Sequence, residues 1–149
     1  MTACRQSPVE GTGGGANLEP SRLLPVLEGR AEILAVYLFG SASRPTAVPR
    51  DLDLAVILRQ GFEPDRFYEF TLAEELERTP GSSLPVDLKI MNRSPLYFQF
   101  KVVREGRLIF NRDNALRGRY EAAVMMRYYD FKPFLDYYNS CLRERIKAS

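Results

Sequence analysis

The chain has 149 residues, with 21 basic and 19 acidic side chains, a net charge of +2 and no histidine. This length suits one globular domain with its own core. The small net charge gives no reason to expect direct nucleic-acid binding, and the lack of histidine excludes Ser-His and Cys-His nucleophiles and most zinc sites. No apolar run approaches the roughly 20 residues of a membrane span. Because a secretory signal pattern is also missing and the two cysteines, Cys4 and Cys141, lie far apart, we expect a cytoplasmic protein.

The predicted elements alternate between helix and strand along the chain. Residues 1–17 are glycine-rich and are expected to form a flexible tail, followed by a single domain over residues 18–149. In chain order, we expect a short helix at 18–29, a strand at 33–39, a helix opening at Ser41, a strand at 52–58, a helix at 64–78, a strand at 84–90, a helix at 92–104 capped by Ser94, a short extended segment at 107–110, and a long helix from 113 onward. This order predicts an α/β domain with a small mixed sheet backed by helices.

Two carboxylates share one face of the second predicted strand. Asp51 and Asp53 point to the same side because side chains alternate along a strand, while the leucines and the valine between 52 and 58 point to the other side. Two like charges about 6–7 Å apart beside an apolar face are costly unless a cation lies between them. Magnesium is bound through one or two carboxylates together with substrate phosphates, so it fits this pair.

The Gly40-Ser41 pair follows the first predicted strand and precedes a predicted helix. A glycine permits close approach of the backbone to a ligand, and the first turn of a helix presents free N–H groups to an anion. Ser41 adds a hydroxyl donor, although the same serine can serve as an ordinary helix cap. Arg44 and Lys89 are further candidates for contacts to phosphate.

Strand, Gly-Ser, a spacer of nine residues and Asp-x-Asp on the next strand together resemble the nucleotidyltransferase superfamily of DNA polymerase beta. The segments Leu38-Phe39-Gly40-Ser41-Ala42-Ser43-Arg44 and 103–113 narrow the resemblance to the minimal nucleotidyltransferases, which include the MntA antitoxins paired with HEPN-domain HepT toxins. The similarity covers roughly residues 30–140.

The resemblance implies a magnesium-dependent enzyme with a polymerase beta-like fold. Asp87, on the third predicted strand, would join Asp51 and Asp53 as the third carboxylate of a site for two Mg²⁺ ions. ATP would be the substrate, and AMP would pass to a hydroxyl of a partner HEPN toxin, a tyrosine by similarity to the MntA group. The chain would therefore be an antitoxin. It departs from the family pattern at Pro45, at Arg50 and in the nine-residue spacer, all of which lie outside the carboxylates.

Two other functions stay open on the sequence alone. One is nucleotide transfer to a small hydroxylated molecule such as an aminoglycoside, although enzymes of that kind usually carry a further helical domain. The other is neutralisation of a toxin by binding without catalysis, for which the three carboxylates would not be needed.

The predicted C-terminal helix is rich in aromatic residues at helical spacing over 120–146. One stripe is expected to dock on the domain, and a second stripe beside it is expected to bind a partner protein because Tyr, Phe and Met are enriched in interface cores. The first stripe consists of Tyr120, Val124, Tyr128, Phe131, Leu135, Tyr138, Leu142 and Ile146; the second consists of Met125, Tyr129, Phe134, Tyr137 and Cys141.

Overall fold

The computed structural model describes residues 20–40, 50–81 and 84–148. Its elements, in chain order, are η1 (Pro20–Leu23), α1 (Leu24–Glu28), β1 (Ile33–Phe39), β2 (Leu52–Leu58), α2 (Tyr68–Glu77), β3 (Val86–Ile90), η3 (Met91–Arg93), α3 (Leu96–Glu105), β4 (Arg107–Asn111) and α4 (Asn114–Ala148). The predicted tail at 1–17, the domain boundary at residue 18 and the helix predicted to open at Ser41 lie outside the described residues.

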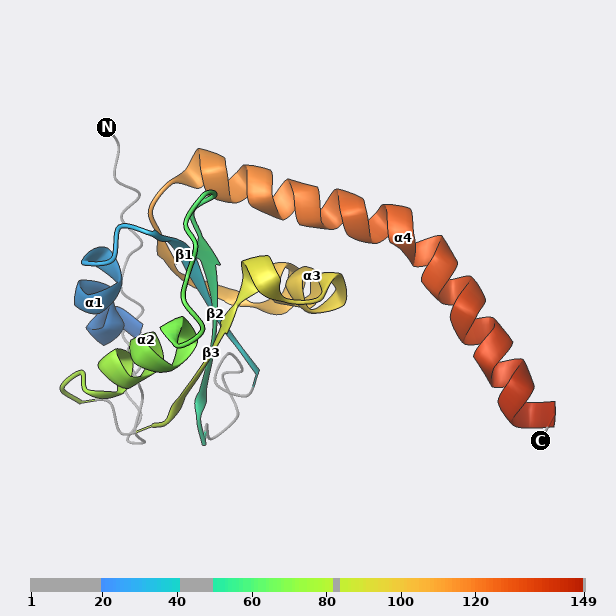
Figure 1. Cartoon of the computed structure of the whole chain (residues 1–149), viewed down its shortest axis with the longest axis horizontal. Coiled ribbons are helices and arrows are strands. Elements are labelled where there is room, and N and C mark those ends of the chain that lie inside the picture. Colours follow the sequence, from blue (N-terminus) through green and yellow to red (C-terminus); the bar gives the residue numbers. More distant parts are fainter. Residues whose placement is uncertain (1–19, 41–49, 82–83, 149) are drawn as a thin grey trace, which may run out of the picture.

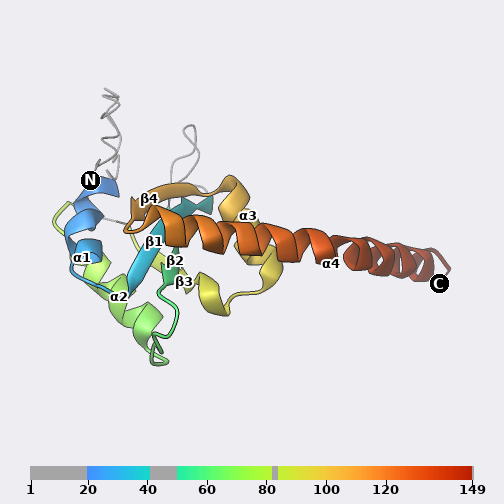
Figure 2. The same cartoon turned by 90° about the horizontal axis from the view of Figure 1, so that it is seen from above.

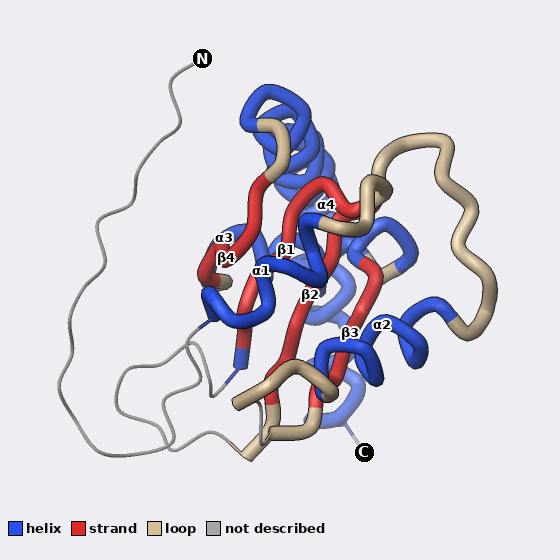
Figure 3. Tube along the Cα trace, turned by 90° about the vertical axis from the view of Figure 1, so that its left-hand side faces the viewer, coloured by secondary structure: helices blue, strands red, loops and turns tan. Residues whose placement is uncertain are grey.

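The four strands form one mixed sheet in the order β3-β2-β1-β4 (Figure 3). Strand β1 is antiparallel to both β2 and β4, whereas β2 and β3 are parallel. The parallel pair is possible because α2 lies between β2 and β3 in the chain and provides the crossover that a parallel connection requires. The α/β architecture with a mixed sheet, predicted from the order of the elements, is therefore confirmed.

Helices cover both faces of the sheet. Figures 1 and 2 show α1 and α2 on one side and α3 and α4 on the other. The α1–α2 side buries alternate residues of β2, including Leu52, Leu54 and Val56, against Leu72 and other side chains of the helices. The opposite residues of β2, including Ala55 and Ile57, belong to a second core cluster with Val102 of α3. Beyond Asp53, β2 is thus apolar on both faces.

Tyr37, Glu121 and Arg117 connect the N-terminal part of α4 to the sheet. The Tyr37 hydroxyl of β1 donates a hydrogen bond to the Glu121 carboxylate, which also accepts from Arg117 Nη1 at 2.8 Å. Burial, followed by the hydrogen bond to Glu121, raises the pKa of Tyr37 above its ordinary value, so its hydroxyl keeps the proton that it donates. Beyond this anchor, the ring of Tyr128 stacks on Phe100 of α3 with a centroid distance of 3.6 Å.

Only the first half of α4 packs on the domain. Val124 is buried, as the prediction for the first stripe requires, but Phe131, Tyr138 and Ile146 of the same stripe are 48%, 60% and 72% exposed. The prediction that this stripe docks on the domain is therefore confirmed at Val124 and wrong for Phe131, Tyr138 and Ile146. A helix of 35 residues is about 52 Å long at 1.5 Å per residue, which exceeds the roughly 23 Å of the seven-residue strand β1 beneath it. The helix bends as it leaves the domain (Figure 1) and contains Pro133.

Two helices begin later than predicted. Helix α2 begins at Tyr68 rather than near Pro64, because the Asp65 carboxylate accepts a hydrogen bond from the Phe67 amide at 2.8 Å and forms a local turn instead. Helix α3 begins at Leu96, and Ser94 does not cap it, since its hydroxyl donates to the Ile90 carbonyl at 2.8 Å. None of the helices that the structure describes is long and apolar enough to span a bilayer.

Candidate active site

The strand register brings the predicted carboxylates together at one end of the sheet, where β2 and β3 begin. Asp53 of β2 lies directly beside Asp87 of β3 in the parallel ladder, on the same face, and neighbouring strands are about 4.8 Å apart. Asp51 precedes β2 by one residue and shares the face of Asp53. Lys89 lies two residues beyond Asp87 on β3, and its ammonium group is 3.6 Å from the Asp87 carboxylate. The structure thus places four of the predicted site residues together.

Gly40 packs against the carboxylate of Asp53. Phe39, the last residue of β1, is paired with Asp53 across the antiparallel ladder, so the next residue of the chain passes beside the Asp53 side chain. A Cβ atom placed on Gly40 would lie 2.4 Å from Oδ2 of Asp53. Gly40 also has φ +71°, a conformation that L side chains rarely adopt. The backbone conformation therefore favours glycine at the end of β1, and a Cβ at this position would displace the carboxylate of Asp53.

The carboxylates form a cluster of like charges. Partial burial raises the pKa of Asp53 above its ordinary value, and the charges of Asp51 and Asp87 raise it further, while Lys89 acts in the opposite direction. Each negative charge here disfavours the others, and a bound cation would relieve that repulsion. The local sequence tolerates the cluster because the rest of β2 is held in the core on both faces.

The donor set fits magnesium in its chemistry. It consists of carboxylate oxygens alone, the ligands that Mg²⁺ prefers, and a magnesium site usually takes one or two carboxylates and completes its coordination with water and substrate phosphates. Within the described ranges, no group of three or more Asp, Glu, Cys or His side chains is arranged to hold a metal ion by itself.

Two of the predicted site residues lie outside the described part of the chain. Ser41 and Arg44 were predicted to contact phosphate, and both lie in the segment 41–49, outside the described residues. The structure also contains a cavity that the sequence did not predict, lined by Arg59, Asn92, Gln99 and residues of α4 at the other end of the sheet. These residues come from segments far apart in the chain and form no motif, so no sequence signal marked them.

The chain belongs to the family described as Polymerase beta, Nucleotidyltransferase. The family model matches residues 22–115, more than half of the 149-residue chain. This range contains β1 to β4 and all the predicted site residues. No curated protein sequence matches the chain significantly.

Solved structures with the same fold come from toxin–antitoxin complexes. A chain from a toxin–antitoxin crystal structure with AMP-PNP has a TM-score of 0.71 and 19% identity, with 85% of this chain and 99% of that chain covered. A chain from the tri-AMPylated Shewanella oneidensis HEPN toxin in complex with MNT antitoxin has a TM-score of 0.66 and 18% identity, with 83% and 95% covered. A chain from an MntA–HepT complex has a TM-score of 0.60 and 16% identity, with 86% and 96% covered. At these identities the similarity establishes the shared fold.

Replacing Gly40 by alanine should destabilise the protein more than the same change at Gly61. Both glycines have positive φ, +71° and +89°, so both substitutions should cost about 1–2 kcal/mol for the backbone conformation. Gly61 has nothing within 4 Å of a new Cβ, whereas at Gly40 the Cβ would meet the Asp53 carboxylate. Urea unfolding of Gly40→Ala and of the matched control Gly61→Ala measures the difference.

The same measurement in an Asp53→Ala background isolates the contact. Without the carboxylate, Gly40→Ala should cost no more than Gly61→Ala. An equal cost of Gly40→Ala with and without the Asp53 carboxylate would show that the contact does not constrain the site.

The substitution Asp53→Asn should stabilise the fold at neutral pH, and the gain should vanish in acid. The folded-state pKa of Asp53 lies above the ordinary value of 3.8, so the unfolded chain gives up this proton more readily than the folded chain does. Ionised Asp53 therefore lowers the free energy of unfolding at neutral pH, and makes no difference well below pH 3.8, where both states are protonated. Urea unfolding between about pH 2.5 and 7 tests this, with Asp130→Asn at an exposed position of α4 as control. A gain that is independent of pH would contradict the cause assigned to it.

Proposed function

We propose that this chain transfers AMP from ATP to a hydroxyl group of a HEPN-type toxin and thereby acts as an antitoxin. The observation that carries the proposal is the cluster of Asp53, Asp87 and Asp51 beside the close-packed Gly40, within a nucleotidyltransferase fold. The similar structures support the choice of donor and acceptor, because they are described as complexes with AMP-PNP and with an AMPylated HEPN toxin.

In this proposal different residues bind the metal ions and the phosphates of ATP. Asp51, Asp53 and Asp87 hold the Mg²⁺ ions together with the phosphates of ATP. Gly40 and Ser41 bring backbone N–H groups and a hydroxyl to the triphosphate, and Arg44 contacts phosphate. Lys89, paired with Asp87 in this structure at 3.6 Å, is half exposed. In this proposal it contacts a phosphate oxygen of ATP.

The reaction is a displacement at the α-phosphorus of ATP. The acceptor hydroxyl oxygen forms a bond to that phosphorus, the bond to the bridging oxygen breaks, and pyrophosphate leaves with the hydroxyl proton released. Magnesium, when bound, would polarise the phosphates and stabilise the charge on the leaving pyrophosphate. The chain itself supplies orientation, because catalysis of such transfers depends mainly on positioning and charge.

The exposed half of α4 supports a protein as the acceptor. Phe134 and Tyr137, on the part of α4 that extends beyond the domain, are 70% and 74% exposed. A row of exposed aromatic side chains on a projecting helix is typical of a protein interface. We place the docking surface for the toxin on α4, within residues 120–146.

The double variant Asp51→Asn/Asp53→Asn should lose AMP transfer by at least a thousandfold while remaining folded. Both carboxylates would hold the metal ions, and without them the charge on the triphosphate is not offset. Mass spectrometry of a purified HEPN toxin, incubated with the protein, ATP and Mg²⁺, measures the gain of AMP. Glu63→Gln/Glu105→Gln, which removes the same charge at exposed positions, is the control. Continued AMP addition by the aspartate variant would refute the assignment of these residues.

The double variant Phe134→Ala/Tyr137→Ala should weaken toxin capture about tenfold or more without changing the binding of ATP and Mg²⁺. Exposed aromatic residues contribute most when they become buried in an interface. Phe67→Ala/Phe70→Ala removes two aromatics of comparable exposure, 56% and 70%, from the other side of the sheet and should leave capture unchanged. Surface plasmon resonance with immobilised toxin gives the affinity. Equal affinity of the α4 variant and the parent would place the interface elsewhere.

A further inference from the structure

A cavity of about 730 Å³ opens between α4 and the sheet, at the end opposite the carboxylates. In the β1–β2 ladder, Asp53 is paired with Phe39, whereas Leu58, which lines the cavity, is paired with Ile33. Leu58 lies five positions beyond Asp53, which is roughly 17 Å along the strand. Ile57, which also lines the cavity, lies on the same face as Asp53. The cavity is therefore on the face of the carboxylates but separate from them.

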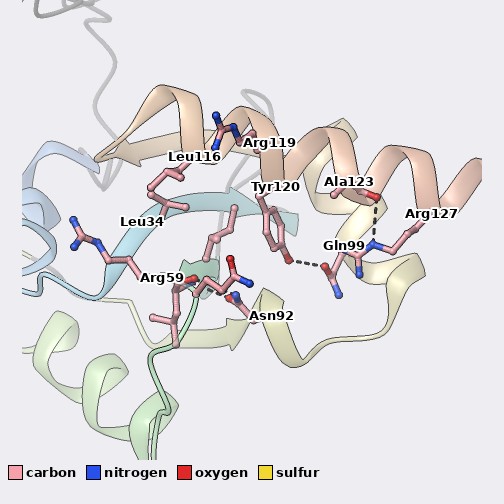
Figure 4. Close-up of a pocket in the computed structure, with 12 residues that line it drawn as sticks. Leu34, Arg59, Asn92, Gln99, Leu116, Arg119, Tyr120, Ala123 and Arg127 are labelled. Carbon is pink, nitrogen blue, oxygen red and sulfur yellow. Dashed lines mark hydrogen bonds between the residues drawn. The ribbon is translucent and has the colours of Figure 1, made fainter.

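The charge of the cavity is positive. Arg59 from the end of β2 and Arg119 and Arg127 from α4 line it, and none of its lining residues is an Asp or Glu. Figure 4 shows Arg59 on one side of the cavity and Arg127 on the other. Within the described ranges these three arginines form no ion pair, although Arg30, Arg78 and Arg117 elsewhere in the domain are paired with glutamates.

The polar walls of the cavity are held in place by hydrogen bonds. The side chain of Asn92 accepts from the Leu58 amide at 2.9 Å and donates to the Leu58 carbonyl at 3.1 Å. The Tyr120 hydroxyl donates to the Gln99 side chain at 2.5 Å (Figure 4), and Gln99 in turn donates to the Ser94 carbonyl at 2.8 Å. Burial raises the pKa of Tyr120 to about 12, so this hydroxyl is neutral at physiological pH and the arginines set the charge.

The floor of the cavity is apolar. Leu34 of β1 and Ile57 of β2 are buried beneath it, and the ring of Tyr120 forms part of its wall. Small-molecule sites combine such an apolar floor with a few polar groups held in position, and they enclose about 300–1,000 Å³. Arginine is suited to phosphate because its planar guanidinium can donate two parallel hydrogen bonds. The cavity therefore has the size, charge and lining for a ligand with both an apolar and a phosphate part.

We propose that this cavity is a second ligand site, which binds a phosphorylated small molecule of mononucleotide size. The phosphate contacts Arg59 or Arg127, and the apolar part of the ligand lies over Leu34, Ile57 and the ring of Tyr120. A single small ligand fits better than a polynucleotide, because the net charge of +2 is too small for general binding to a polyanion. The site needs no metal ion and is independent of the proposed transfer reaction.

Isothermal titration of the full chain with AMP in EDTA tests the site directly, because EDTA removes any contribution from metal-dependent binding at the carboxylates. We expect saturable binding of AMP, weaker binding of inorganic phosphate and little binding of adenosine. The double variant Arg59→Gln/Arg127→Gln should weaken AMP binding at least tenfold. Arg143→Gln/Arg145→Gln, which removes the same charge from the exposed end of α4, should leave it unchanged. Circular dichroism confirms that both variants are folded.

Several results would overturn the proposal. Absence of AMP and phosphate binding to the parent protein would do so, as would equal loss of binding in the two arginine variants, which would indicate a general effect of net charge. Unchanged AMP binding in Arg59→Gln/Arg127→Gln would place the nucleotide elsewhere. Tighter binding of a ten-nucleotide single-stranded RNA, with the same dependence on Arg59 and Arg127, would identify a nucleic-acid surface instead. Continued AMP addition by the Asp51→Asn/Asp53→Asn variant would refute the transfer proposal but would have no bearing on this site, so the two proposals fail separately.

Discussion

The pairing of Asp53 with Asp87 across two parallel strands is the constraint on which the rest of this structure depends. Like charges on neighbouring strands repel each other, so a sheet with this register is stable only where other interactions hold the strands. Those interactions come from the apolar remainder of β2, which is buried on both faces. Strand β1 also contributes to this end of the sheet, since its pairing with β2 brings Gly40 against the carboxylate of Asp53.

The two faces of the sheet contribute differently to this arrangement. The face under α1 and α2 is a continuous apolar core, which holds β2 and β3 in register. The face under α3 and α4 carries the carboxylates at one end, a small apolar cluster around Ala55 and Val102 in the middle, and the arginine-lined cavity at the other end. About 17 Å of strand separates the charged ends, twice the Debye length of about 8 Å at physiological ionic strength. Each end can therefore attract its own ligand, although the net charge of the chain is only +2.

Helix α4 serves two surfaces because it is longer than the sheet. Its first turns close the face of the sheet through Tyr37, Glu121 and the stack of Tyr128 on Phe100. The same turns supply Arg119 and Arg127 to the cavity wall. The remainder projects beyond the domain with its aromatic side chains exposed. A ligand in the cavity and a protein on the projecting half would thus contact one continuous helix.

The amino-acid sequence was enough to predict the order of the described elements, the mixed α/β class, the common face of Asp51 and Asp53 and the nucleotidyltransferase family, because alternation along a strand and the Gly-Ser and Asp-x-Asp motifs are local properties. The family resemblance placed Asp87 in the same site. Its register opposite Asp53, the packing of Gly40 on the Asp53 carboxylate and the point at which α4 leaves the domain follow only from the folded chain. The fold also brings Arg59 and Arg127 to opposite sides of one cavity. These features join residues 13 to 68 positions apart in the chain. A local sequence pattern does not predict contacts between residues this far apart in the chain. These contacts follow from how the strands pair and from how far α4 extends beyond the sheet.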